Sequence, residues 1–174
     1  SAASDVYKRQ VLKDGQAGTS LYETNSVDDT LVSSEQADKY KDSPSFNKRL
    51  TAGTFFIKMN QKNKPEFKNK NLRKAIAKSI DKETYVNSTL NNGSTVSNKF
   101  TATGTAKTPE GKDFASTVKS PLNFDKKDAK NNWKKAQKEL GKKNVTFTLN
   151  VEDTPGAKIS AEYINLKLKI ICLA

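Results

Sequence analysis

The side chains that most often carry out catalysis or hold metals are scarce in this sequence. It contains no histidine and a single cysteine, Cys172, among 174 residues. Histidine is the usual general base and the commonest zinc ligand, so its absence removes the serine–histidine and cysteine–histidine nucleophile pairs. One cysteine excludes a disulfide within the chain and a cysteine metal cluster. Carboxylates are present without a paired-carboxylate motif, so we expect no catalytic residue, no metal site and no cofactor.

Lysine is the abundant chemical group, and it is unevenly placed. Lys and Arg number 31 against 19 Asp and Glu, which gives a formal net charge of +12. Residues 1–57 hold seven basic and eight acidic side chains, whereas residues 58–174 hold 24 and 11. A basic half raises the alternative hypothesis of a small nucleic-acid-binding module in residues 58–174. Affinity that falls steeply with salt would identify such a module.

Three features of the basic half weigh against that alternative. Arginine, the usual base-reading residue, occurs only at Arg9, Arg49 and Arg73. The lysines are mixed with Asn, Asp and Glu, and aromatic residues do not alternate with them as a stacking platform requires. We therefore interpret the charge as a solvated surface and expect no nucleic-acid partner.

The composition indicates a polar, soluble chain. The hydrophobic fraction is 34% and the mean hydropathy is −0.78. No apolar run approaches the roughly 18 residues that a membrane helix needs. The sequence opens at Ser1 without a basic-then-apolar signal segment, so we expect that a signal was removed or that the true start is missing.

The pattern of residues 54–87 predicts a strand, a lysine-rich turn and two helices. A central strand is predicted over residues 48–60, because its run Phe55 to Met59, two residues after Gly53, is apolar and rich in β-favouring residues. Asn69 is placed to cap a helix whose apolar residues share one face. Those apolar residues are Leu72, Ala75, Ile76 and Ile80. Asp81 is placed to cap a second helix, which ends at Asn91-Asn92-Gly93.

Further elements are predicted on either side of this stretch. Residues 144–151 alternate apolar and polar side chains, the clearest strand signal in the chain. A helix capped by Asp125 or Asp128 carries Trp133 on its apolar face and ends at Gly141, so Trp133 is expected in the core. Another helix opens at Pro155. Residues 94–121 are irregular, and a loop this long is usually functional or wraps a surface.

Residues 55–86 carry a family resemblance. The order F-x-I-x-M-N, a short basic loop with F-x-N, then L-R-K-A-I-A-x-S-I-D-K-E-x-Y-V resembles the peptide-binding proteins of ABC importers, the extracellular solute-binding proteins of family 5. The segment Tyr22 to Asp28 is similar to the family's Y-x-x-G-x-(I/V/L)-D, with Asn25-Ser26 at the turn. The usual glycine is absent, and Asn25 tolerates the left-handed conformation that the turn requires.

The resemblance implies an α/β fold, part of the type II periplasmic-binding-protein fold. The family has two lobes, and this chain would supply the end of the first lobe and about half of the second, so we interpret it as a fragment. The expected division is residues 1–10 as a foreign or disordered end, 11–32 as the end of the first lobe and the crossover, 33–164 as a partial second lobe, and 165–174 as an atypical tail.

The same resemblance implies a set of peptide-contacting positions. Relatives place residues beside the peptide at positions matching Val32, Ser33, Thr51, Phe56 and Lys58. A lysine there could meet a peptide carboxylate. Two alternatives stay open: Phe56 lies in the core with Lys58 at a strand end, and Ser33 or Ser34 is an ordinary helix cap.

The function implied by the resemblance is capture rather than catalysis. An extended oligopeptide would be enclosed between two lobes and delivered to a membrane permease. The expected partners are therefore an oligopeptide and the permease of an ABC importer, with the binding protein itself a monomer. The expected location is outside the cytoplasmic membrane, either lipid-anchored at its outer face or periplasmic.

Overall fold

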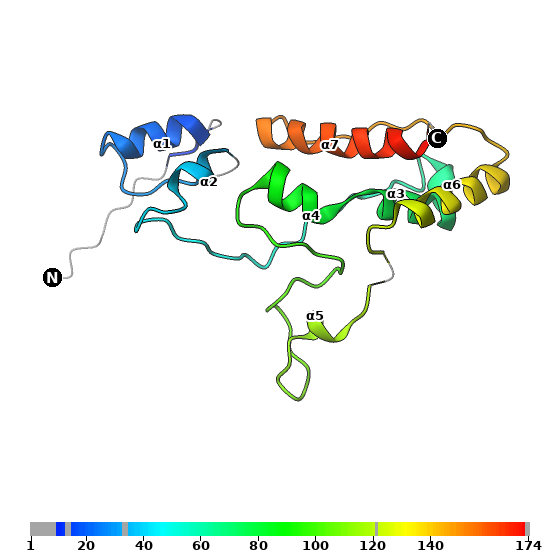
Figure 1. Ribbon diagram of the computed structural model, residues 1–174, viewed down its shortest axis with the longest axis horizontal. Coiled ribbons are helices and arrows are strands. Elements are labelled where there is room, and N and C mark those ends of the chain that lie inside the picture. The colour runs from blue at the N-terminus through cyan, green and yellow to red at the C-terminus, as the bar shows by residue number, and fades with distance from the viewer. Residues whose placement is uncertain (1–9, 13–14, 33–34, 121, 173–174) are drawn as a thin grey trace. The chain divides into compact units, whose positions relative to one another are not determined.

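The computed structural model describes residues 10–12, 15–32, 35–120 and 122–172. The chain forms two compact units, Ser1–Phe46 and Asn47–Ala174. Each unit is described by itself, and Figure 1 shows the helices of both.

The first unit contains two short helices, α1 (Gly15–Glu23) and α2 (Glu35–Tyr40). Asn25 has a φ of 54°, so the left-handed turn predicted at this asparagine is confirmed. The turn is closed by the Ser26 amide, which donates to the Leu21 carbonyl at 2.8 Å. The Glu23 carboxylate accepts hydrogen bonds from Lys39 and Tyr40, which joins the end of α1 to α2.

The second unit begins its regular structure at the lysine-rich turn. A short 3₁₀ helix, η1 (Pro65–Lys68), leads into α3 (Lys70–Ser79). The predicted cap is confirmed, because the Asn69 side chain accepts from the Leu72 amide at 2.8 Å. The predicted second helix is divided into α4 (Lys82–Thr84) and a π-helical turn, η2 (Tyr85–Leu90), which ends at Asn91 with a φ of 38°.

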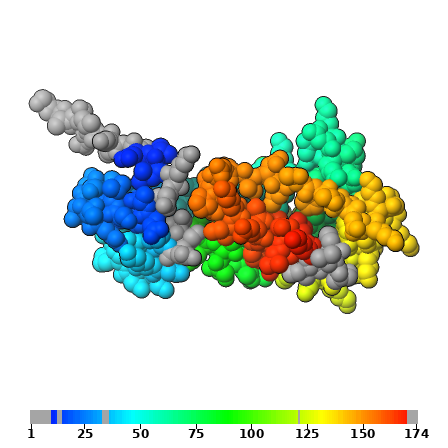
Figure 2. Space-filling view, turned by 90° about the horizontal axis from the view of Figure 1, so that it is seen from above, coloured from blue at the N-terminus to red at the C-terminus, as the bar shows by residue number. Residues whose placement is uncertain are grey.

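Two longer helices complete this unit, with α5 (Phe114–Thr117) in the irregular stretch before them. Helix α6 (Lys126–Leu140) is capped by Asp125, whose carboxylate accepts from the Asp128 amide at 2.8 Å, and it ends at Gly141 with a φ of 62°. Helix α7 (Pro155–Cys172) runs without a break into the residues expected to form an atypical tail. Figure 2 shows α7 crossing one face of the unit.

The core of the second unit lies where α3 packs against α6. Trp133 is 4% exposed, so its prediction as a core residue is confirmed. Leu72, Ala75 and Ile76 of α3 are buried with it. Helix α7 is tied to the α4–η2 region by the Tyr163 hydroxyl, which donates to the Asp81 carbonyl at 2.7 Å. The Tyr85 hydroxyl bonds to Ser160 on α7 at 2.9 Å.

The two predicted strands are wrong for this structure. Residues 48–60 and 144–151 are irregular, and the only β-bridge in the described ranges joins Lys107 and Asp113. Alternating hydrophobicity indicates which side chains can be buried, and Met59, Val145 and Phe147 do pack on the core. A strand also needs a neighbouring backbone to hydrogen-bond with, and none of the described segments supplies one. The α/β character expected from the sequence is therefore not formed, and the described elements are helices.

No helix in the described part of the chain combines the length and the apolar character needed to cross a membrane.

Candidate functional site

Three of the five predicted contact positions lie on one exposed segment, residues 47–60 of the second unit. Thr51 and Lys58 are exposed, and the Phe56 side chain is 66% exposed. Between them only Thr54 and Ile57 are half-buried. The alternative in which Phe56 belongs to the core is therefore wrong for this structure, because the ring lies at the surface.

An aromatic neighbour that the sequence did not single out stands beside Phe56. The rings of Phe56 and Phe100 have centroids 6.0 Å apart and planes tilted by 53°, a favourable arrangement for an aromatic pair. Phe100 is itself 82% exposed. The one feature of the sequence that could have indicated a role for Phe100 is its position in the long irregular stretch 94–121, because long loops are often functional.

The loop that carries Phe100 is held by a partly buried lysine. The Lys82 ammonium donates to the Asn98 side-chain oxygen at 2.7 Å and lies 3.4 Å from the Leu122 carbonyl. Burial lowers the pKa of Lys82, because leaving water disfavours its charged form. Lys99 also donates to the Ala115 carbonyl. The Lys82 contacts hold both ends of the loop against α4, and the Lys99 bond joins two parts of the loop to each other.

The remaining two predicted positions are in the first unit. Val32 is half-buried in an irregular segment after α1. Ser33 lies outside the described residues, as does Ser34, the alternative helix cap. Of the five predicted positions, Thr51, Phe56 and Lys58 therefore share one exposed segment, and no contact between them is found in the described part of the chain.

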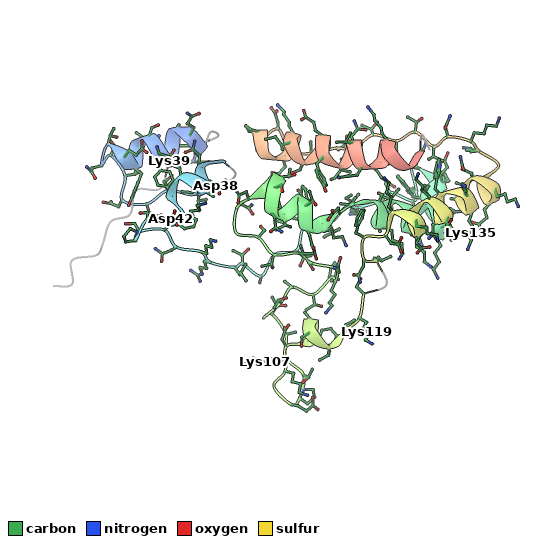
Figure 3. The ribbon with its side chains drawn as sticks, viewed as in Figure 1. Asp38, Lys39, Asp42, Lys107, Lys119 and Lys135 are labelled. Carbon is green, nitrogen blue, oxygen red and sulfur yellow. The ribbon has the colours of Figure 1, made fainter. Side chains whose placement is uncertain are left out.

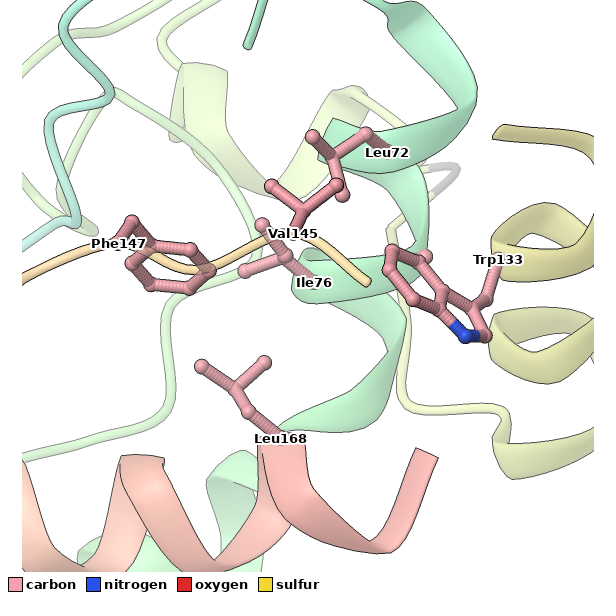
Figure 4. Close-up of a pocket in the computed structure, with 7 residues that line it drawn as sticks. Leu72, Ile76, Trp133, Val145, Phe147 and Leu168 are labelled. Atoms are coloured by element: carbon pink, nitrogen blue, oxygen red, sulfur yellow. The ribbon is translucent and has the colours of Figure 1, made fainter. Parts of the chain in front are cut away.

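Two small spaces between the described elements of the second unit are packing gaps. One, of about 20 Å³, lies among Leu72, Ile76, Trp133, Val145, Phe147 and Leu168 (Figure 4). The other, of about 40 Å³, lies between the 57–59 segment, the 147–149 segment and α7. Sites for small ligands are typically hundreds of cubic ångströms in volume, so neither gap fits a peptide.

The lysine-rich turn that follows the 47–60 segment contains a group of ion pairs. The Glu66 carboxylate accepts from Lys142 at 2.6 Å and has the Lys64 ammonium 3.6 Å away. Hydrogen bonding from Lys142 is the main reason that the pKa of Glu66 falls to about 2. In the part of the chain described, no three His, Cys, Asp or Glu side chains gather as a metal site would require.

The exposed 47–60 segment presents aromatic, hydroxyl and cationic side chains to solvent. Sequence comparison identifies the family. Residues 6–171 match "Bacterial extracellular solute-binding proteins, family 5 Middle", so the chain belongs to this family, which consists of solute-binding proteins rather than enzymes.

Individual relatives agree with this assignment. The chain is 29% identical to the dipeptide-binding protein DppE of Bacillus subtilis over 166 residues, which is 95% of this chain and 30% of that protein. Among solved structures, the pheromone receptor PrgZ, described with its mode of peptide binding, is 35% identical with a TM-score of 0.85 over 94% of this chain and 32% of its own. Peptide-bound OppA of Listeria monocytogenes is 35% identical with a TM-score of 0.84, covering 94% of this chain and 33% of that one.

The chain thus spans about a third of the length of these relatives. The fold is that of part of an oligopeptide-binding protein, and the expectation of a fragment of this family is confirmed.

Proposed function

We propose that this chain is part of the substrate-binding component of a peptide ABC importer. The intact protein captures extracellular oligopeptides between two lobes and delivers them to a membrane permease. The observation that carries this proposal is the likeness to peptide-bound OppA, with a TM-score of 0.84 over 94% of the chain.

The exposed 47–60 segment supports a role in peptide contact. Phe56 and Phe100 offer an apolar aromatic surface for a peptide side chain. Lys58 offers a cation for a peptide carboxylate, and Thr51 offers a hydroxyl for the peptide backbone. In this proposal Val32 and Ser33, at the crossover, complete the set of contacts.

The proposed placement in the cell follows from the same family. The family is one of extracellular proteins, which supports the proposal. We propose that the intact protein lies at the outer face of the cytoplasmic membrane, lipid-anchored or periplasmic, beside the permease. The binding protein acts as a monomer that closes on one peptide. The proposed lobes are the type II periplasmic-binding-protein lobes, with residues 11–32 ending the first and residues 33–164 forming part of the second.

The ligand retained by the intact protein tests this proposal. The reading frame around the chain is first extended to its start and stop codons, and the encoded protein is purified without denaturation. Mass spectrometry of the released ligands should find peptides. Release of sugars, metal complexes or free amino acids instead of peptides would overturn the proposed substrate class. A frame confined to these 174 residues would overturn the two-lobe proposal.

A further inference from the structure

Helix α6 carries a row of lysines on the face opposite the core. Lys127, Lys134 and Lys138 are exposed, and they are spaced at i, i+7 and i+11 along one line of the helix surface. The buried residues of the helix lie on its other side and are Ala129, Asn132, Trp133 and Ala136. We call the three exposed lysines the lysine stripe, and it is roughly 16 Å long at the helical rise per residue.

The acidic side chains of α6 are turned away from this stripe. Asp128 forms an ion pair with Lys78 of α3 at 3.0 Å. Glu139 accepts hydrogen bonds at 2.7 Å from Asn69 and from Asn71. Both carboxylates are thus engaged on the side where α6 meets α3. Throughout the described ranges, no lysine of the stripe forms an ion pair, so its positive charge faces solvent uncompensated.

Two further lysines widen this charged face. Lys130 is half-buried and lies on one flank of the stripe. Lys135, labelled in Figure 3, is exposed on the other flank, where its charge also interacts with the Asp128 and Glu139 carboxylates. Segregation of the acids to one side of a helix leaves a field of a single sign on the other, which attracts a negatively charged surface.

We propose that the lysine stripe contacts the headgroups of anionic phospholipids. The inference rests on the proposed function, which places the protein beside a membrane. Lysine suits it, because an ammonium acts as a point charge toward phosphate without the fixed geometry of arginine. The apolar side of α6 is buried in the core, so the contact is electrostatic and peripheral, without insertion of the helix. Helix α6 itself exposes no aromatic side chain, and Phe124 just before it is a single exposed ring, so the face lacks the series of rings on which single-stranded nucleic acid stacks.

Vesicle binding tests this inference. The intact protein encoded by the extended reading frame is sedimented with vesicles of equal parts phosphatidylglycerol and phosphatidylcholine, and with vesicles of phosphatidylcholine alone. We expect binding to the anionic vesicles only, with loss of binding as salt shortens the range of the charges. Each lysine near an anionic surface contributes about a fivefold factor in partitioning, so the K127Q/K134Q/K138Q variant should bind roughly a hundredfold more weakly.

Lysines elsewhere in the second unit provide a matched control. Lys107, Lys112 and Lys119 are exposed in the segment around α5, where Figure 3 labels the first and last of them. The K107Q/K112Q/K119Q variant has the same net charge as the stripe variant and should keep most of the binding. A K127R/K134R/K138R variant preserves charge and should also bind. Circular dichroism verifies that all three variants are folded like the parent chain.

Several outcomes would overturn the inference. They are absence of binding to anionic vesicles, equal weakening by both glutamine variants, and equal binding to neutral vesicles. If the parent protein bound duplex DNA more tightly than anionic vesicles, and only the stripe variant lost that binding, the lysine stripe would be a nucleic-acid-binding surface instead. The proposed function is judged separately, since peptide binding by the intact protein should be the same in the stripe variant as in the parent protein.

Discussion

Phe56 and Phe100 are exposed aromatic residues that contact each other. Large aromatic side chains are usually buried, yet these two expose 66% and 82% of their surfaces and contact each other. Each ring shields only part of the other from water. A ligand side chain laid over the pair would bury the remaining apolar area, which is the role proposed for them in the intact protein.

Lys58 is predicted to recognise the carboxylate of a bound peptide. In the intact protein, Lys58→Gln should weaken binding of a peptide with a free carboxyl terminus by about tenfold or more, because a charge-assisted hydrogen bond is lost. The C-terminally amidated peptide should be affected much less. Lys62→Gln is the matched control, since Lys62 is an exposed lysine in the neighbouring turn. Equal effects on the free and amidated peptides would show that Lys58 does not bind the carboxylate.

Glu66 is predicted to make the stability of the folded chain depend on pH under acidic conditions. Its pKa is about 2 in the folded chain against a usual 4.5, so its contribution to stability is fully present above pH 4.5. Protonation removes that contribution as the pH falls through the folded-state value. The difference in unfolding midpoint between the parent and Glu66→Gln should therefore shrink as the pH is lowered from 5 toward 2. Lys142→Gln should raise the pKa of Glu66, as a carboxyl titration by NMR would reveal.

At the scale of elements, the helix boundaries were predictable from sequence because they depend on local chemistry. Asn69 and Asp125 each present a side-chain acceptor to free amides in the first turn. Gly141 and Asn25 take the positive φ that ends a helix. Each of these interactions joins residues fewer than seven positions apart, so the sequence contains both partners side by side.

Elements that depend on distant partners could not be predicted in the same way. The alternation in residues 144–151 correctly indicated that Val145 and Phe147 face the core. The alternation does not indicate whether another backbone runs alongside. In the described chain residues 144–151 have no such backbone partner, so they do not form a strand. The contact of Phe56 with Phe100 crosses more than forty positions in sequence, and no local pattern records it.

The cap of α6 gives a prediction at this scale. Asp125→Ala removes the acceptor for the Asp128 amide, and loss of a helix cap costs about 1 kcal/mol. Chemical denaturation followed by circular dichroism should show that loss. Asn123→Ala is the control, because Asn123 is exposed just outside the helix and should leave stability nearly unchanged. A cost as large for Asn123 as for Asp125 would disprove the capping role.

For the whole molecule, exposed apolar surface is the dominant feature. Phe55 is 100% exposed, Leu31 88% and Leu50 62%. We predict that the 174-residue chain binds a hydrophobic dye and unfolds with weak cooperativity, because its two units have small cores and leave large apolar side chains in water. Fluorescence of the dye and a thermal scan measure both properties. A sharp two-state transition without dye binding would indicate a complete, self-sufficient domain.

The family relationship offers a reason for this exposed surface. The chain covers 30 to 33% of the length of the relatives compared. In our proposal, the rest of a longer protein supplies the backbone partners that residues 48–60 and 144–151 lack. Phe55 would then be covered by protein, while Phe56 would remain available to the peptide.

Peptide binding by the intact protein tests the central proposal most directly. Calorimetry would compare a mixture of oligopeptides with the same amino acids in free form. The proposal predicts saturable binding of the oligopeptides, weakened by Phe56→Ala, and no binding of the free amino acids. Absence of oligopeptide binding, or preference for the free amino acids, would contradict it.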